Sequence, residues 1–207
     1  MLAARSPMLV PAPGWRVDEE ARVPLRGGRA VRVRPIRVQD AGAEQAFVAG
    51  LSLESRHKRF HIGLRRLSSA MLREMVEVDQ HRHVAFVAEE LLADSGAAPA
   101  AAPRLVADAR YVRSPQRPAE AEFAIAVADA WQGLGLGRAL IARLLRHARR
   151  EGVRTLVGDV LAENRRMIVL MQGLGAVARA HPDGPQLVRV VLDLDAPVMR
   201  RPPPDPV

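Results

Sequence analysis

The segment that most restricts the fold is a run of alternating glycines, Gly133, Gly135 and Gly137, between a strand-like segment and an amphipathic helix. The strand pattern ends at Val127, and a helix is predicted from about Leu136 because apolar residues recur there at helical spacing. Glycines allow a tight turn and the close approach of a ligand to the backbone. Such a turn also presents free N–H groups at the positive end of a helix, so we expect it to bind phosphate.

Two common nucleotide-binding patterns do not fit this turn. A Rossmann site has G-x-G-x-x-G near the start of a βαβ unit and an acidic residue about 20 residues later, whereas these glycines alternate strictly and lie past the middle of the chain. A Walker loop requires Gly-Lys-Ser/Thr, but Gly137 is followed by Arg138 and Ala139. The glycines alone are also compatible with a purely structural connection, so the surrounding pattern has to decide.

Around the turn, strand and helix patterns follow one another in a mixed α/β order. Asp40 and Ser68 stand at expected N-cap positions, and the Ala- and Pro-rich segment 93–103 is typical of a surface loop. Strands are expected near 31–35, 84–88, 104–112, 120–128, 153–160, 176–180 and 187–194, and helices near 40–50, 52–59, 68–78, 136–150 and from Glu163.

Composition excludes several classes of protein. A chain of 207 residues that is 48% hydrophobic can bury one sizeable core. The absence of cysteine rules out disulfides, thiolate metal sites and a cysteine nucleophile. With no apolar segment of about 18 residues and no continuous signal segment, we expect a cytoplasmic protein without a membrane span. His81 and His83 lack a nearby third ligand, so no metal is predicted.

The formal net charge is +8, and Lys58 is the only lysine among the cationic residues. Such a surface attracts anions, which include nucleic acid, acidic protein and a phosphorylated small molecule such as CoA. The base composition of the genome is an equally good explanation for part of the arginine content. With only 3% aromatic residues, base stacking is disfavoured, which argues against nucleic acid as a partner.

Two segments of the sequence, one at the glycine turn and one after the next strand, resemble motifs of a known family. Residues 127–140, VADAWQGLGLGRAL, are similar to the central motif Gln/Arg-x-x-Gly-x-Gly/Ala of the GNAT superfamily of acyl-CoA N-acyltransferases. Residues 161–167, LAENRRM, resemble the segment whose asparagine opens the next helix beside the cofactor. Together with residues 51–56 and Arg59-Phe60, the pattern is similar to the catalytic domain of bacterial protein-lysine acetyltransferases over roughly residues 30–195.

The resemblance implies a GNAT fold of the α/β (α+β) class. Its central sheet would be mixed but mostly antiparallel, with about six to seven strands flanked by helices. The domain is expected at 30–195, between an N-terminal extension at 1–29 and a Pro-rich C-terminal tail at 196–207.

The resemblance also implies acetyl-CoA as the cosubstrate and assigns its contacts. The strand before the turn would diverge from its neighbour, with the pantetheine arm lying in the gap and the pyrophosphate lying on the turn. Asn164 would contact the cofactor arm or orient the neighbouring backbone. The pantetheine is assigned to Ile125, Ala126 and Val127, and the pyrophosphate to Gln132, Gly133, Leu134, Gly135, Leu136, Gly137, Arg138 and Ala139.

A lysine acceptor requires a base, because an amine with a pKa of about 10.4 is about one part in 10³ neutral near pH 7. Glu120 and Glu122 lie on one face of the strand before the turn, beside small alanines that leave room for an amine, whereas Phe123 faces the opposite side. The resemblance places the general base of bacterial protein-lysine acetyltransferases at Glu122, which we therefore choose over Glu120. The alternative is a solvated strand glutamate without a catalytic role.

We therefore expect an N-acetyltransferase that passes an acetyl group directly from acetyl-CoA to an amine, with a protein lysine as the first choice. Many GNAT enzymes carry a tyrosine after the asparagine to protonate the CoA thiolate, but none lies between Asn164 and Gly175, and Tyr111 is the only one in the chain. The alternatives are a small-molecule amine acetyltransferase and a non-catalytic acyl-CoA sensor. The partner is thus an acceptor protein or a small amine, and a homodimer is left open.

Overall fold

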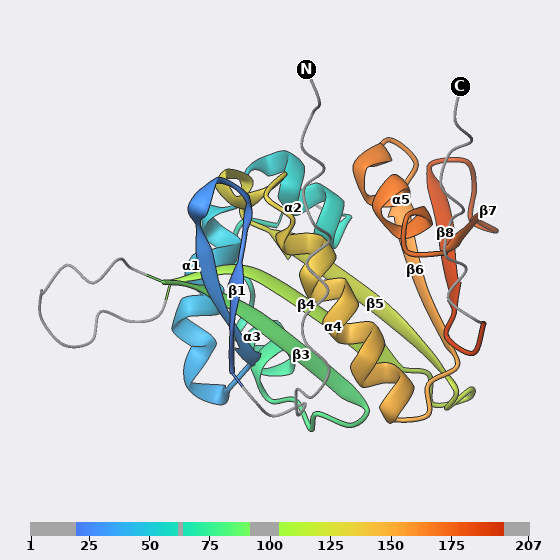
Figure 1. Ribbon diagram of the computed structural model, residues 1–207, viewed down its shortest axis with the longest axis horizontal. Coiled ribbons are helices and arrows are strands. Elements are labelled where there is room, and N and C mark those ends of the chain that lie inside the picture. The colour runs from blue at the N-terminus through green and yellow to red at the C-terminus, as the bar shows by residue number, and fades with distance from the viewer. Residues whose placement is uncertain (1–19, 62–63, 92–103, 197–207) are drawn as a thin grey trace, which may run out of the picture.

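The computed structural model describes residues 20–61, 64–91 and 104–196. Within them, eight strands form one sheet in the order β1-β2-β3-β4-β5-β6-β8-β7 (Figure 1). The strands are β1 (Ala21–Pro24), β2 (Ala30–Pro35), β3 (His83–Glu90), β4 (Leu105–Arg113), β5 (Glu120–Val127), β6 (Thr155–Leu161), β7 (Val177–Ala180) and β8 (Leu187–Asp193). The helices are α1 (Ala41–Gly50), α2 (Leu53–Phe60), α3 (Ser69–Val76), α4 (Leu136–Arg150) and α5 (Arg165–Gln172), with short 3-10 turns η1 (Arg26–Gly28), η2 (Val38–Asp40) and η3 (Asp129–Trp131).

The predicted fold class is confirmed, and the sheet is mostly antiparallel because only β5 and β6 pair in parallel. The sheet has more strands than the six to seven expected. The additional strand is β1, which pairs with β2 and comes from the segment assigned to the N-terminal extension. It has only four residues, too few for an alternating pattern to be recognised. The predicted loop at 93–103 and most of both end segments lie outside the described residues.

One face of the sheet is covered by α4 and α5, and α4 crosses in front of the strands in Figure 1. The apolar stripe predicted for α4 is confirmed, because every residue in it is at most 5% exposed. Those residues pack against β3, β4 and β5, whose inward side chains include Phe86, Tyr111 and Phe123. The stripe consists of Leu136, Leu140, Ile141, Leu144, Leu145 and Ala148.

The other face is covered by α1, α2 and α3, but only over one part of the sheet. Phe47 and Val48 of α1 pack with Met75 of α3 over Val87 of β3 and Ala126 of β5. This cluster contains no residue of β6, β7 or β8 among those that the structure describes. Within the described part of the chain, the second face of the sheet is therefore open beyond β5. None of the described helices combines the length and the apolar character needed to cross a membrane.

Asp40 stands at the N-cap position of α1, as expected, but its carboxylate bonds to residues outside the helix. It accepts two hydrogen bonds from the guanidinium of Arg34, at 2.7 and 2.8 Å, and one from the backbone N–H of Arg37 at 2.8 Å. No side-chain hydrogen bond caps the helix. Asp40 thus joins α1 to β2, and because both side chains are almost completely buried, each charge needs the other as its partner.

Candidate active site

The strands β5 and β6 diverge just above Glu122. Their parallel pairing is limited to Glu120–Glu122 against Thr155–Val157, although both strands continue beyond these residues (Figure 1). At the point of divergence, Gly158 faces Phe123, and a Cβ at Gly158 would overlap the phenyl ring. The glycine therefore lets the ring fill the base of the opening. The strand edge above it, toward Val127, is left without a β6 partner.

The three residues expected along the pantetheine all lie on this free edge of β5. The side chains of Ile125 and Ala126 are buried in the two opposite core clusters, at 9% and 8% exposure, and Val127 is half-buried. Their side chains therefore stabilise the sheet, while the backbone groups on the edge toward β6 have no strand partner, and of these the Val127 carbonyl accepts from the side chain of Gln132.

The glycine turn has the backbone geometry of an anion-binding helix start. Gly133 and Gly135 have φ values of 76° and 94°, in the left-handed region that disfavours L side chains. Gly135 is the N-cap of α4, and no side chain caps the helix there. The first N–H groups of α4 thus have no intrahelical acceptor. The reason for glycine at these two positions is conformation, because a Cβ at either would meet nothing within 4 Å.

The turn is held in place by α2. Asp129, just after β5, accepts hydrogen bonds from the backbone N–H and the hydroxyl of Ser52, at 2.9 and 2.7 Å, and from the hydroxyl of Ser55 at 2.7 Å. Partial burial opposes ionisation of Asp129, but these hydrogen bonds outweigh it and lower its pKa. Gln132 extends the link, since its Nε2 donates to Ser55 Oγ and to the Val127 carbonyl, both at 3.1 Å.

Sequence reasoning missed this contact between α2 and the turn. Ser52 was recognised as a helix start, and it does cap α2 by accepting from the N–H of Ser55 at 3.1 Å. Nothing in the spacing indicated that the same hydroxyl also donates to Asp129, 77 residues away. The remaining predicted cofactor residue, Asn164, is the N-cap of α5, where its side chain accepts from the N–H of Met167 at 3.3 Å.

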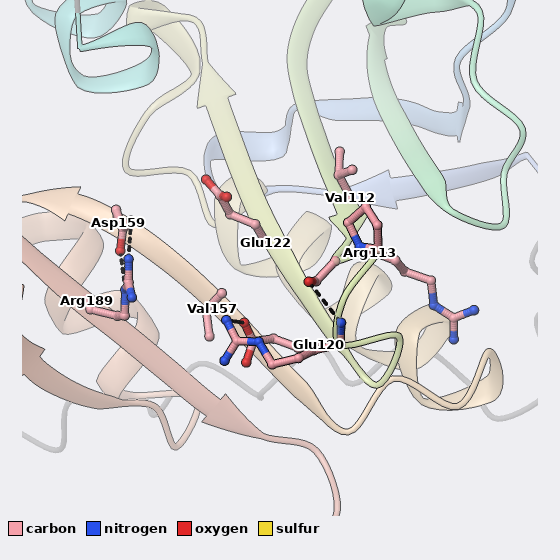
Figure 2. Close-up of a pocket in the computed structure, with 10 residues that line it drawn as sticks. Val112, Arg113, Glu120, Glu122, Val157, Asp159 and Arg189 are labelled. Atoms are coloured by element: carbon pink, nitrogen blue, oxygen red, sulfur yellow. Dashed lines mark hydrogen bonds and ion pairs between the residues drawn. The ribbon is translucent and has the colours of Figure 1, made fainter.

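The two glutamates of β5 differ in their surroundings. Glu120 forms an ion pair with Arg117 at 2.8 Å and is mostly buried. Glu122 is exposed and makes no hydrogen bond or ion pair within the described part of the chain. Glu122 lies between Val112 of β4 and Val157 of β6, with which it is in register (Figure 2). Only Glu122 therefore presents a carboxylate with free lone pairs.

Both glutamates line a pocket of about 310 Å³ on the open face of the sheet (Figure 2). On its far side, Arg189 donates to both carboxylate oxygens of Asp159, at 2.7 and 2.8 Å. His181 adds a contact to Asp159 at 3.0 Å. These interactions lower the pKa of Asp159, the hydrogen bonds from Arg189 being the largest cause. The lining residues are Val112, Arg113, Ser114, Pro115, Arg117, Glu120, Glu122, Val157, Asp159 and Arg189.

A cluster of buried charges lies beside this strand, under α1 and α2. Oδ1 of Asp108 in β4 accepts from Nε of Arg110 at 2.9 Å, and Nη2 of Arg59 lies 4.0 Å from the same oxygen. Glu44 of α1 is fully buried, and neither of its carboxylate oxygens has a hydrogen-bond partner. Burial, followed by the charge of Asp108, raises the pKa of Glu44 to about 8. The sequence predicted a basic helix end near the acceptor cleft around Arg59 and nothing at Glu44.

The only tyrosine faces away from the pocket. Tyr111 is buried on the α4 side of the sheet, where its hydroxyl lies 2.8 Å from Nδ1 of His147. Burial raises its pKa. Among the described residues no group of three or more histidine, aspartate, glutamate or cysteine side chains is placed to hold a metal ion.

Comparisons with known proteins agree with this geometry. The model of the acetyltransferase (GNAT) family matches residues 66–176. An acetyltransferase of Pseudomonas aeruginosa is 35% identical over 159 residues, which are 77% of this chain and 81% of the relative. The acetyltransferase Pat of Mycolicibacterium smegmatis is 32% identical over 75% of this chain but only 44% of its own length, so this chain spans less than half of it.

Among solved structures, the GNAT domain of S. lividans PAT is similar. It superposes with a TM-score of 0.72 at 31% identity, covering 84% of this chain and 96% of that domain. The similarity thus extends over most of this chain and nearly all of that domain.

Proposed function

Because this chain belongs to the acetyltransferase (GNAT) family, we propose that it transfers the acetyl group of acetyl-CoA to the side-chain amine of a protein lysine, with Glu122 as general base. The family membership makes it an acyl-CoA N-acyltransferase. The observation that supports the amine acceptor and the general base is the free carboxylate of Glu122, which lies in an open pocket directly below the divergence of β5 and β6.

The residues present fit the cofactor. The unpaired edge of β5 at Ile125–Val127 offers amide groups to the amides of a pantetheine arm. The N–H groups that open α4 suit a pyrophosphate, with Gly133 and Gly135 providing the left-handed turn and Arg138 exposed beside them. When bound, acetyl-CoA supplies the thioester carbonyl that the amine attacks.

Glu122 removes the proton that keeps the lysine amine unreactive. A carboxylate held by an ion pair has its lone pairs engaged, which disfavours Glu120 beside Arg117. Glu122 has no such partner and is accessible, so it can accept a proton directly or through a water. A positioned base contributes about 10²–10⁴ to the rate, which is the size of the effect assigned to Glu122.

Tyr111 does not serve as the acid for the departing thiolate. Its hydroxyl is buried against His147 on the opposite side of the sheet from Glu122. A thiol has a pKa of about 8.5, so the thiolate is a fair leaving group and can take its proton from water.

The test is release of free CoA thiol from acetyl-CoA in the presence of lysine peptides, for the wild type, Glu122→Gln and Glu120→Gln. Glu122→Gln is expected to lower kcat about 10²–10⁴-fold near neutral pH while CoA still binds. Glu120→Gln serves as the matched control on the same strand and should lower kcat by less than about tenfold. An unchanged kcat for Glu122→Gln would remove it as the base.

A further inference from the structure

One row of side chains crosses five strands at the level of Glu122. The registers pair Val112 with Glu122, Glu122 with Val157, Val157 with Val191 and Val191 with Val177. Residues paired in register point to the same face of a sheet. The four valines therefore lie in one row, here called the valine row, which Glu122 interrupts between Val112 and Val157 and which is continuous from Val157 to the edge strand β7.

The valine row lies on the open face of the sheet. Val112 and Val177 are 45% and 56% exposed and are among the most exposed large apolar side chains of the described residues. Val157 and Val191 between them are half-buried. Isolated exposed valines need no explanation, but a continuous apolar band that starts at a reactive carboxylate is typical of a binding surface.

Resting on the proposed lysine acetylation, we propose that the valine row docks the polypeptide that carries the acceptor lysine and selects lysines flanked by aliphatic side chains. Neighbouring strands lie about 4.8 Å apart, so Val191 and Val177 stand roughly 10 and 14 Å from Glu122 along the row. In an extended peptide, the residues two and four positions from the lysine point the same way, at about 7 and 13 Å. Their side chains would therefore cover the row.

Two arginines that line the pocket beside the row are already paired with carboxylates. On one side Arg189 is already paired with Asp159 through two hydrogen bonds, and on the other Arg117 is paired with Glu120 at 2.8 Å. Neither arginine is therefore available to a flanking carboxylate without losing its present partner. The valines are the part of this surface that gains most from contact with an acceptor.

An acceptor polypeptide fits this surface better than a second copy of the chain. A second copy bound along the whole row would cover Glu122 and close the pocket that the reaction needs. A small amine, in contrast, would use only the part of the row between Val112 and Val157, and would leave Val191 and Val177 without a contact. The partner must also leave after each turnover, as an acceptor does.

The experiment compares two lysine peptides that differ only at the second and fourth residues on each side of the lysine, with leucine in one and serine in the other. We expect wild type to favour the leucine peptide by about tenfold or more in kcat/KM. Val177→Thr and Val191→Thr should each reduce this preference about three- to tenfold, because threonine keeps the strand but is polar. Val38→Thr is the matched control, since Val38 is 55% exposed but lies in η2, outside the row.

A binding measurement without acetyl-CoA separates docking from chemistry. Fluorescence anisotropy of peptides with norleucine in place of lysine should show the same order of preference and the same losses. Equal rates and equal binding for the two peptides, or an unchanged preference in Val177→Thr and Val191→Thr, would overturn the docking proposal while leaving lysine acetylation intact. A dimer in sedimentation that Val177→Thr and Val191→Thr dissociate would also overturn it. If wild type acetylates small amines but neither peptide, lysine acetylation itself fails, and docking with it.

Discussion

The two faces of the sheet bury different kinds of side chain. Under α4 and α5 the buried side chains are mainly apolar, and the glycine turn rests on this cluster. Under α1 and α2, Glu44, Asp108 and Arg110 are buried beside the apolar residues. The proposed cofactor side thus uses backbone groups on an apolar scaffold, whereas the proposed acceptor side depends on side chains that neutralise one another. Changes on the two sides should therefore have different consequences.

The largest expected effect is on the acceptor side. Asp108→Ala removes the carboxylate that accepts from Arg110 and faces Arg59, and leaves two buried guanidinium groups without it. Removing one partner of a buried pair costs about 3–5 kcal/mol of unfolding free energy, measurable by urea denaturation. Glu54→Ala is the control, because the pair of Glu54 with Lys58 is exposed to solvent and its loss should change the free energy of unfolding far less. Equal losses for the two variants would contradict the distinction between the faces.

A smaller effect on stability is expected on the cofactor side, with a larger one on binding. Gly135→Val places a β-branched residue at a φ of 94°, which costs about 1–3 kcal/mol. The turn should then shift its N–H groups, and the Kd for CoA measured by calorimetry should rise on the order of 10²-fold. Gly42→Ala in α1 is the control, because a Cβ there meets nothing within 4 Å. If Asp108→Ala weakened CoA binding as much as Gly135→Val does, the two sides would not be separable.

A third expected effect, spread over several pH units, is a dependence of stability on pH that arises from Glu44. Its pKa is raised from 4.5 to about 8, so the folded protein keeps a proton that the unfolded chain loses. Stability from this group is therefore complete below about pH 4.5 and falls as pH rises toward 8, by at most about 1.4 kcal/mol per pH unit.

Glu44→Gln removes this dependence, because glutamine has no proton to lose. The difference in unfolding free energy between wild type and Glu44→Gln should therefore shift in favour of the variant between pH 5 and pH 8. Urea denaturation at three pH values measures it, and the difference cancels the other titrating groups. A difference that stays constant with pH would show that Glu44 is ionised in the folded protein.

The features of the fold and the site that could be predicted from the sequence are those formed by residues close together along the chain. The turn, α4 and the N-cap at Asn164 are local patterns, in which neighbours in sequence are neighbours in space. Glu122 could be placed on the correct face of β5 because strand side chains alternate. Whether the carboxylates of Glu120 and Asp129 are free depends on their partners in the fold. The partners of Asp129 are two serines of α2, and this contact could not be predicted from the sequence.

The sequence by itself determined the order of the main elements and the turn at Gly133–Gly137, because hydrophobic period and glycine position act over a few residues. It indicated the family through the resemblance of residues 127–140 and 161–167 to known motifs. Only the tertiary structure decided that Asp40 pairs with Arg34, that Glu44 is buried beside Asp108 and that four valines line up with Glu122. These arrangements depend on strand registers and on helices packed against strands far away in the chain. Their energies exist only when the separate segments have come together, so no local pattern encodes them.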